Sequence, residues 1–214
     1  MLISEDKKLV FIHVQKTGGA SFSMLLKNNI PDLKSVLRQH ATVREAKEIL
    51  GDNWDDYYKI AFVRNPWDRL VSWYSMITQY GKKLTWNEKL VNLVKRERHN
   101  KIWQYVLIHS DSFEDFICNC ADATNRAGWK PFLYNQTDYL VDEYGNILVD
   151  YIGRYENYAE DVKNIFQQIK IEITDIPHLN KSSRLDYKSY YNDVTRDIVA
   201  LRFRKDIVNF NYKY

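Results

Sequence analysis

Cysteine, glycine and proline are all scarce in this chain of 214 residues, and each shortage excludes a class of protein. The two cysteines, Cys118 and Cys120, are too few for a structural zinc site, and their spacing suits a disulfide poorly. We therefore expect two reduced thiols in a reducing compartment. With Gly 7 and Pro 4 there is no linker that would mark a domain boundary, so we expect a single domain over residues 1–214.

A large excess of charge of one sign and long apolar runs are missing as well. Lys+Arg 31 against Asp+Glu 28 gives a formal net charge of +3, without the basic excess of a protein that wraps nucleic acid. Any anion site must therefore be local. No run approaches the roughly 20 apolar residues of a membrane span, and the first residues include acids where a signal peptide has positive charge. The expectation is a soluble, cytoplasmic protein.

Hydrophobic residues make up 45% of the chain and form alternating strand and helix patterns. Three short apolar runs predict strands at Leu9–Val14, Lys59–Val63 and Leu148–Gly153. Because these runs are apolar on both faces, they fit a buried parallel sheet. A strand followed by a helix occurs twice, which favours an α/β fold whose central parallel sheet is covered by helices on both faces.

Helices are expected after the first two strands, between them, and late in the chain. The sequence TVRE at Thr42–Glu45 is a capping box whose helix would end at Gly51, and Pro66 can open a helix capped by Asn65. The inward positions are predicted to be Phe22, Leu25 and Leu26; Val43, Ala46, Ile49 and Leu50; Leu70, Val71, Tyr74 and Ile77; Val162, Ile165, Phe166 and Ile169; and Val194, Ile198, Leu201 and Phe203.

The stretch FIHVQKTGGAS joins the first predicted strand to a helix through one lysine and two glycines. Glycines let backbone N–H groups approach an anion, and the helix N-terminus adds the positive end of its dipole. Lys16 precedes Gly18 and Gly19, whereas the lysine of a Walker A loop follows the glycines, so this is not a Walker A loop. The stretch predicts a phosphate-binding loop, with an ordinary tight turn as the alternative.

A second cation follows the second predicted strand, in IAFVRNPWDRLVSWY. Arg64 lies at the strand end, where ligands of open α/β sheets bind, and its planar guanidinium suits a phosphate. Ser72 lies off the apolar stripe of the next helix and is not expected in the core. One anion at each of two strand ends indicates a bisphosphate.

The segments FIHVQKTGGASF and AFVRNPWDRLVSWY resemble the signature segments of sulfotransferases that use 3′-phosphoadenosine 5′-phosphosulfate, especially carbohydrate sulfotransferases and their small bacterial relatives. The resemblance continues through RQHATVREAKEILG, VDYIGRYENY and IPHLNKSSRLDYKSYY, and is weakest between Lys82 and Lys130. It implies a P-loop-like three-layer fold, no metal, and in-line transfer of a sulfuryl group to a hydroxyl acceptor, expected to be a saccharide.

The resemblance also implies roles for individual residues. It matches residues 16–21 to the 5′-phosphosulfate loop and Arg64 and Ser72 to the 3′-phosphate site. It matches Lys181, Ser182 and Arg184 to a late loop that contacts the cofactor. Gln15 and Ala20 depart from the pattern, since the relatives often have proline and a hydroxyl residue there. The implied cofactor-binding residues are Lys16, Thr17, Gly18, Gly19, Ala20, Ser21, Arg64, Ser72, Lys181, Ser182 and Arg184.

His40, just before the capped helix, is the expected general base, because a histidine in the corresponding segment of the carbohydrate enzymes is the proposed base. It would accept the hydroxyl proton while Lys16 stabilises charge on the leaving bisphosphate. His13 lies in an apolar strand and is expected to be a packed core histidine; its closeness to Lys16 makes it the alternative base. Glu156 is expected to be a structural acid.

Two other functions stay open at this point. One is a nucleotide-dependent kinase, which the position of Lys16 disfavours. The other is a non-catalytic nucleotide-binding module, which the presence of both Lys16 and His40 disfavours. The basic segment 82–101 is interpreted either as a solvated helix face or as a surface that receives a polar or acidic substrate.

Overall fold

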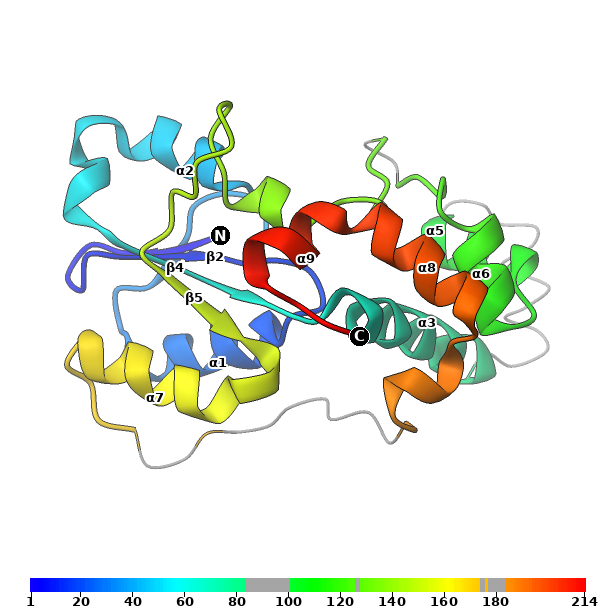
Figure 1. The fold of residues 1–214 in the computed structure, drawn as a ribbon. Coiled ribbons are helices and arrows are strands. Elements are labelled where there is room, and N and C mark those ends of the chain that lie inside the picture. The colour runs from blue at the N-terminus through cyan, green and yellow to red at the C-terminus, as the bar shows by residue number, and fades with distance from the viewer. Residues whose placement is uncertain (84–100, 126–127, 174–175, 177–183) are drawn as a thin grey trace. The chain divides into compact units, whose positions relative to one another are not determined.

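A computed structural model gives the fold and describes residues 1–83, 101–125, 128–173, 176 and 184–214 (Figure 1). The chain divides into two compact units, each built from two separated stretches. Unit 1 comprises Met1–Asn65 and Asn135–Lys181, and unit 2 comprises Pro66–Tyr134 and Ser182–Tyr214. The expectation of a single domain over residues 1–214 stays a prediction.

Unit 1 is built on a sheet of order β3-β1-β2-β4-β5 (Figure 1). Its parallel part aligns Phe11 of β2 with Ile60 of β4, and Ile60 with Tyr151 of β5. The strands are β1 (Leu2–Ser4), β2 (Leu9–Ile12), β3 (Lys34–Ser35), β4 (Tyr58–Val63) and β5 (Tyr151–Arg154).

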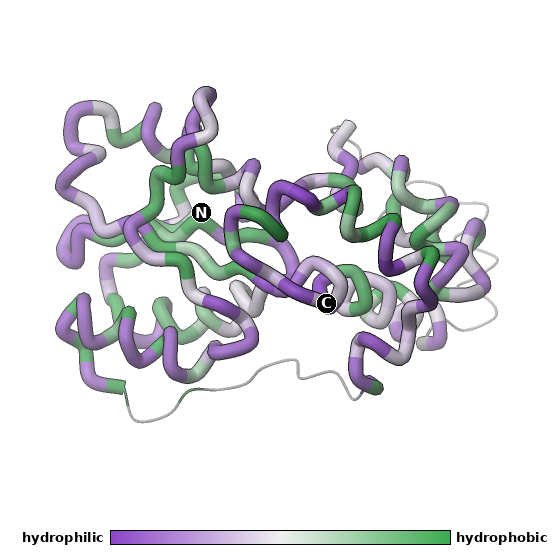
Figure 2. Tube along the Cα trace, in the orientation of Figure 1, coloured by the Kyte–Doolittle hydropathy of each residue, from purple (hydrophilic) through white to green (hydrophobic). Residues whose placement is uncertain are grey.

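One edge of the sheet corrects the prediction of a purely parallel arrangement. β1 pairs antiparallel with both β2 and β3, so the sheet is mixed. With 3 and 2 residues, these two strands are too short to show a strand pattern in the sequence. The central strands are hydrophobic along their length, which agrees with the buried runs from which they were predicted (Figure 2).

Helices cover both faces of this sheet. α1 (Gly19–Asn29) and α7 (Tyr158–Gln168) lie on one side and α2 (Val43–Leu50) on the other (Figure 1). The short 3₁₀ helices η1 (Gly51–Asp56), η2 (Thr137–Tyr139) and η3 (Tyr155–Asn157) complete the unit. The predicted three-layer α/β arrangement is therefore confirmed. The core between the sheet and α1 and α7 contains the positions predicted to face inward, namely Phe22, Leu25, Leu26, Val162, Ile165, Phe166 and Ile169.

The capping box of α2 is confirmed. The Thr42 side chain accepts a hydrogen bond from the Glu45 N–H, the Glu45 side chain accepts one from the Thr42 N–H, and Gly51 caps the helix C-terminus. The prediction that Ile49 faces inward is wrong, because this short helix buries only Val43 and Ala46 fully and Ile49 is exposed.

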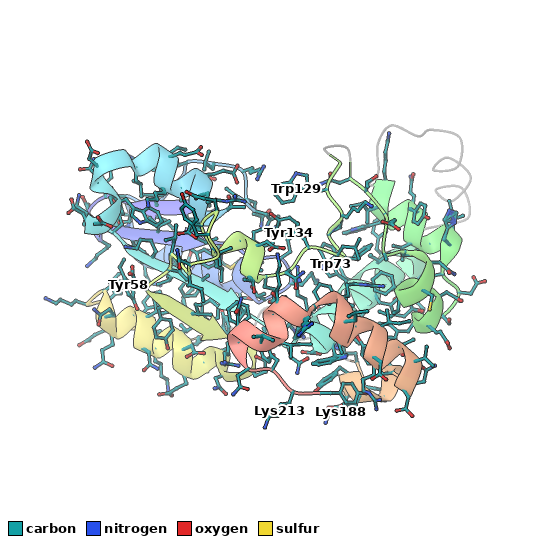
Figure 3. The ribbon with its side chains drawn as sticks, turned by 45° about the horizontal axis from the view of Figure 1, so that its top comes forward. Tyr58, Trp73, Trp129, Tyr134, Lys188 and Lys213 are labelled. Atoms are coloured by element: carbon teal, nitrogen blue, oxygen red, sulfur yellow. The ribbon has the colours of Figure 1, made fainter. Side chains whose placement is uncertain are left out.

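Unit 2 is helical within its described residues. It comprises α3 (Pro66–Lys83), α5 (Lys101–His109), α6 (Phe113–Asn119), η4 (Tyr187–Tyr190), α8 (Asp193–Arg202) and α9 (Arg204–Phe210). Pro66 opens α3 as predicted, and Leu70, Val71 and Ile77 are buried, with Tyr74 packed against their cluster. Trp129 and Tyr134 pack together, with ring centroids 5.1 Å apart (Figure 3).

The stripe predicted for the last long helix is partly wrong. Val194 and Leu201 are exposed, whereas Val199 and Phe203 are buried as part of the core of unit 2. The buried face of α8 includes Thr195, which also closes the N-terminal capping box with Asn192. A polar residue thus occupies a core position that the hydrophobic pattern assigned to its neighbours.

The remaining expectations concern thiols, membranes and the basic segment. Cys118 is exposed and Cys120 is buried, and both are free thiols as expected. In the described part of the chain, no helix combines the length and apolar character needed to span a membrane. Most of the basic segment 82–101, from residue 84 to residue 100, lies outside the described residues.

Candidate functional site

The predicted phosphate loop connects β2 to α1 in unit 1. Its backbone is left-handed at Lys16, with φ 67°, and at Gly18, with φ 84°. Glycine adopts this conformation freely, whereas a residue with a side chain pays roughly 1 kcal/mol or more. α1 begins at Gly19, and its first helical hydrogen bond runs from the Phe22 N–H to the Gly18 carbonyl. The loop therefore delivers the chain to a helix N-terminus, where backbone donors and the helix dipole favour an anion.

Close neighbours explain the two adjacent glycines. A Cβ atom at Gly18 would lie 3.2 Å from ring atoms of both Tyr155 and Tyr158. A Cβ atom at Gly19 would lie 2.2 Å from Cδ2 and 2.3 Å from Nε2 of His13, which is closer than real atoms approach. Gly18 thus supplies the turn beneath two tyrosine rings, and Gly19 leaves room for the imidazole of His13.

Thr17 holds the loop from within. Its side chain is buried, and its hydroxyl donates a hydrogen bond of 2.9 Å to the Val14 carbonyl. The prediction that Thr17 binds the cofactor does not include this contact. The contact makes the side chain a support for the loop backbone. Ser21 is buried at the start of α1, and Ala20 beside it is exposed.

Arg64 is buried at the end of β4 and reaches the loop. Its Nη1 donates to the Lys16 carbonyl at 3.1 Å, and the guanidinium carbon lies 3.7 Å from the centre of the Tyr155 ring. The Gln136 side chain accepts from the Arg64 N–H at 2.8 Å and donates to the Arg64 carbonyl at 2.7 Å, as a neighbouring strand would. The structure therefore joins the two predicted anion-binding segments directly.

His40 is held against the first residue of the loop. Its Nδ1 lies 2.8 Å from the carbonyl oxygen of His13, and the two imidazole rings meet edge to face with centroids 4.8 Å apart. A carbonyl oxygen can only accept, so the proton of neutral His40 is on Nδ1 and the lone pair is on Nε2. This is the arrangement that a general base requires.

His13 is packed and buried as predicted, but it directly follows β2 and is not part of that strand. It is 5% exposed, and its ring stacks on Phe11 with centroids 5.6 Å apart. Burial, with a further contribution from His40, lowers the pKa of His13 to about 3. The imidazole is therefore neutral throughout the physiological pH range.

Of the remaining predicted site residues, two belong to unit 2 and two are not described by the structure. Ser72 is a partly buried residue of α3 in unit 2, and Arg184, also in unit 2, forms an ion pair with Asp68 in which both side chains are largely buried. Lys181 and Ser182 lie outside the described residues. The structure thus brings together Lys16–Ser21, Arg64 and His40, and the roles of all the predicted site residues stay predictions.

Several contacts of the site were not identified from the sequence. Gln39 lies beside His13, Gln136 brackets the backbone of Arg64, and Tyr155 stacks on its guanidinium. Glu156 accepts a hydrogen bond of 2.6 Å from the Asn65 N–H at the end of β4, which is a structural contact. Tyr155 and Glu156 belong to the segment VDYIGRYENY and Gln39 belongs to RQHATVREAKEILG, and the resemblance of these segments to the family was the available signal.

Comparison with known proteins places the chain among its relatives. The family model described as "Sulfotransferase family" matches residues 1–213. Carbohydrate sulfotransferase 11 from Mus musculus is 24% identical over an alignment of 183 residues, and the match covers 78% of this chain and 52% of that relative. The chain therefore spans about half the length of this curated relative. The crystal structure of a sulfotransferase from Alicyclobacillus acidocaldarius is 16% identical, with a TM-score of 0.33, and the match covers 79% of this chain and 60% of that one. Because the family match extends over nearly all of its residues, this chain belongs to the sulfotransferase family.

Proposed function

We propose that this chain is an enzyme that transfers a sulfuryl group from 3′-phosphoadenosine 5′-phosphosulfate to a hydroxyl of a carbohydrate acceptor. One observation carries the proposal: His40 is hydrogen-bonded to His13, and the ring of His13 lies against Gly19 of the anion loop. A basic nitrogen with a fixed lone pair and a helix N-terminus suited to an anion are thus built into one cluster of unit 1.

The residues of the cluster fit the charged groups of this cofactor. Gly18 provides the left-handed turn that delivers the chain to α1, Gly19 begins this helix, whose N-terminus favours an anion, and Lys16 adds a cation. Arg64, attached to the Lys16 carbonyl, provides a second positive group for the 3′-phosphate. When bound, the cofactor would supply the sulfuryl group, whose bond to the 5′-phosphate oxygen breaks as the acceptor oxygen bonds to sulfur.

The protein side of the reaction then needs a base and a charge stabiliser. His40 would take the acceptor proton at Nε2 while its Nδ1–H keeps the hydrogen bond to the His13 carbonyl, so the ring is oriented before and after proton transfer. Lys16 and the backbone N–H groups of the first turn of α1 would stabilise the negative charge left on the 5′-phosphate. General-base catalysis of this kind contributes about 10²- to 10⁴-fold in rate.

A carbohydrate is the proposed acceptor because the relative from Mus musculus is named a carbohydrate sulfotransferase. A screen with cofactor labelled in its sulfuryl group should place label in saccharides rather than in phenols or simple alcohols. Label in phenols alone would contradict the saccharide proposal but not sulfuryl transfer. Bisphosphate binding without transfer to any acceptor would favour the non-catalytic module. The cytoplasm stays our proposed location.

Adenosine 3′,5′-bisphosphate is expected to raise the melting temperature of the protein in the absence of metal ions, because both phosphates would find cations or N–H donors in unit 1. A ligand at 100 times its Kd stabilises the folded state by about 2.7 kcal/mol. Adenosine 5′-phosphate, which lacks the 3′-phosphate, and ATP should each give a smaller shift in the same thermal assay. A shift with Mg-ATP that equals or exceeds the bisphosphate shift would favour a kinase.

Arg64→Ala is expected to weaken binding of adenosine 3′,5′-bisphosphate by about tenfold or more, since a charge-assisted contact is worth roughly 1.5 to 3 kcal/mol. Loss of the bond to the Lys16 carbonyl would add to this effect. Isothermal calorimetry measures the combined loss of bisphosphate affinity. Arg44→Ala, on the exposed face of α2, is the matched control. An unchanged Kd would show that the 3′-phosphate binds elsewhere.

A further inference from the structure

The imidazole of His13 faces the start of α1. Its Cδ2–Nε2 edge is the part of the ring that a Cβ atom at Gly19 would overlap, at 2.2 and 2.3 Å. Gly19 is the first residue of α1, a helix of 11 residues. A side chain that is 5% exposed therefore directs a polar atom toward the place where an anion would meet the helix N-terminus.

Gln39 determines which nitrogen of His13 carries the proton. Its Nε2 lies 3.3 Å from His13 Nδ1, and an amide nitrogen can only donate, so Nδ1 is the acceptor. The proton of the neutral ring is then on Nε2. Among the described residues, the side chain of His13 hydrogen-bonds through Nδ1, and Nε2 has no partner. An N–H group whose hydrogen bond no protein atom accepts can donate it to a ligand.

We propose that His13 is a further cofactor-binding residue, whose Nε2–H donates a hydrogen bond to an oxygen of the phosphosulfate group at the N-terminus of α1. This inference rests on the proposed function. It gives the two adjacent histidines opposite tautomers, with a donor at Nε2 of His13 and an acceptor at Nε2 of His40. It also argues against His13 as the base, because its lone pair on Nδ1 is turned to Gln39.

Substitution of His13 tests the contact. His13→Leu should weaken binding of adenosine 3′,5′-bisphosphate about tenfold or more, and His13→Gln should recover most of the affinity because its amide can donate. Adenosine 3′-phosphate, which lacks the 5′-phosphate, is the control ligand, and its affinity should be the same in all three proteins. Equal losses for both ligands, or no loss for the bisphosphate, would overturn the proposal.

A measurement on the unmutated protein is independent of whether the variants fold. In ¹⁵N imidazole spectra assigned by through-bond correlation to the backbone of the unmutated protein, His13 should stay a neutral Nε2–H tautomer between about pH 5 and 8. Its Nε2 resonance should move when adenosine 3′,5′-bisphosphate is added. An Nδ1–H tautomer, or a resonance that does not respond although calorimetry shows binding, would refute the role of His13 alone. No binding to the unmutated chain would refute the proposed function itself.

Discussion

His40→Ala is expected to lose turnover by about 10²- to 10⁴-fold while its fold and its affinity for adenosine 3′,5′-bisphosphate stay close to those of the unmutated chain. The reason is that His40 contacts the site through the His13 carbonyl, at 2.8 Å, and presents its lone pair on the opposite nitrogen. Turnover is measured with labelled cofactor and affinity by calorimetry. His109→Ala, at the exposed end of α5, is the matched control.

The pH dependence of activity sharpens this prediction. Activity of the unmutated enzyme should rise with pH across the range in which histidines titrate, because only a neutral imidazole can accept the acceptor proton. The residual activity of His40→Ala should lack that rise. Near-normal turnover, or a loss of bisphosphate affinity as large as the loss of rate, would remove His40 from the role of base. A larger rate defect in His13→Leu with normal affinity would move that role to His13.

Gly19→Ala is expected to destabilise the fold by roughly 1 to 3 kcal/mol, the usual cost of overpacking a core. The added methyl group would lie 2.2 Å from Cδ2 of His13, whose ring has Phe11 on one side and His40 on another. The ring therefore has little room to move. Bisphosphate affinity should fall as well, because the overlap is at the first residue of α1.

A double-mutant cycle isolates the cause of this effect. In the His13→Ala background the methyl group no longer meets a ring, so Gly19→Ala should cost much less there, which corresponds to a coupling of roughly 0.5 to 3 kcal/mol. The free energy of unfolding is measured by denaturant titration. Gly145→Ala is the control, since a Cβ there meets nothing within 4 Å and only the φ of 90° opposes it. Strictly additive effects at residues 13 and 19 would contradict the steric explanation.

The layers of unit 1 and the anion loop could be predicted because each has a local signal. Buried parallel strands are apolar on both faces, the TVRE capping box lies within four residues, and KTGGAS is continuous in the sequence. The antiparallel edge could not be predicted, because a strand of 2 or 3 residues is too short to show a period. On α8, Thr195 occupies a core position that hydrophobicity alone assigns elsewhere.

The contacts of the candidate site were harder to predict than its residues. The Gln39 amide meets His13 across 26 positions of sequence, and the Gln136 amide meets Arg64 across 72. A single amide in a loop has no periodicity that would indicate its partner. The sequence therefore indicated Lys16 and Arg64 as cations at strand ends, and His40 as a base just before a capped helix. It did not indicate that Arg64 binds the Lys16 carbonyl or that His40 binds the His13 carbonyl.

The hydrogen bonds around the loop occupy several of its carbonyl oxygens, which are its hydrogen-bond acceptors. Each residue of a loop contributes one N–H donor and one carbonyl acceptor, so a bare loop would repel an anion with its carbonyls about as much as it attracts one with its N–H groups. Here four carbonyls are already turned to donors, at His13 by His40, at Val14 by Thr17, at Lys16 by Arg64 and at Gly18 by Phe22. These four carbonyls are therefore less able to repel an anion. Discrimination between anions and other small molecules at this loop would therefore come from the neighbours that occupy its acceptors, as much as from the lysine that carries its charge.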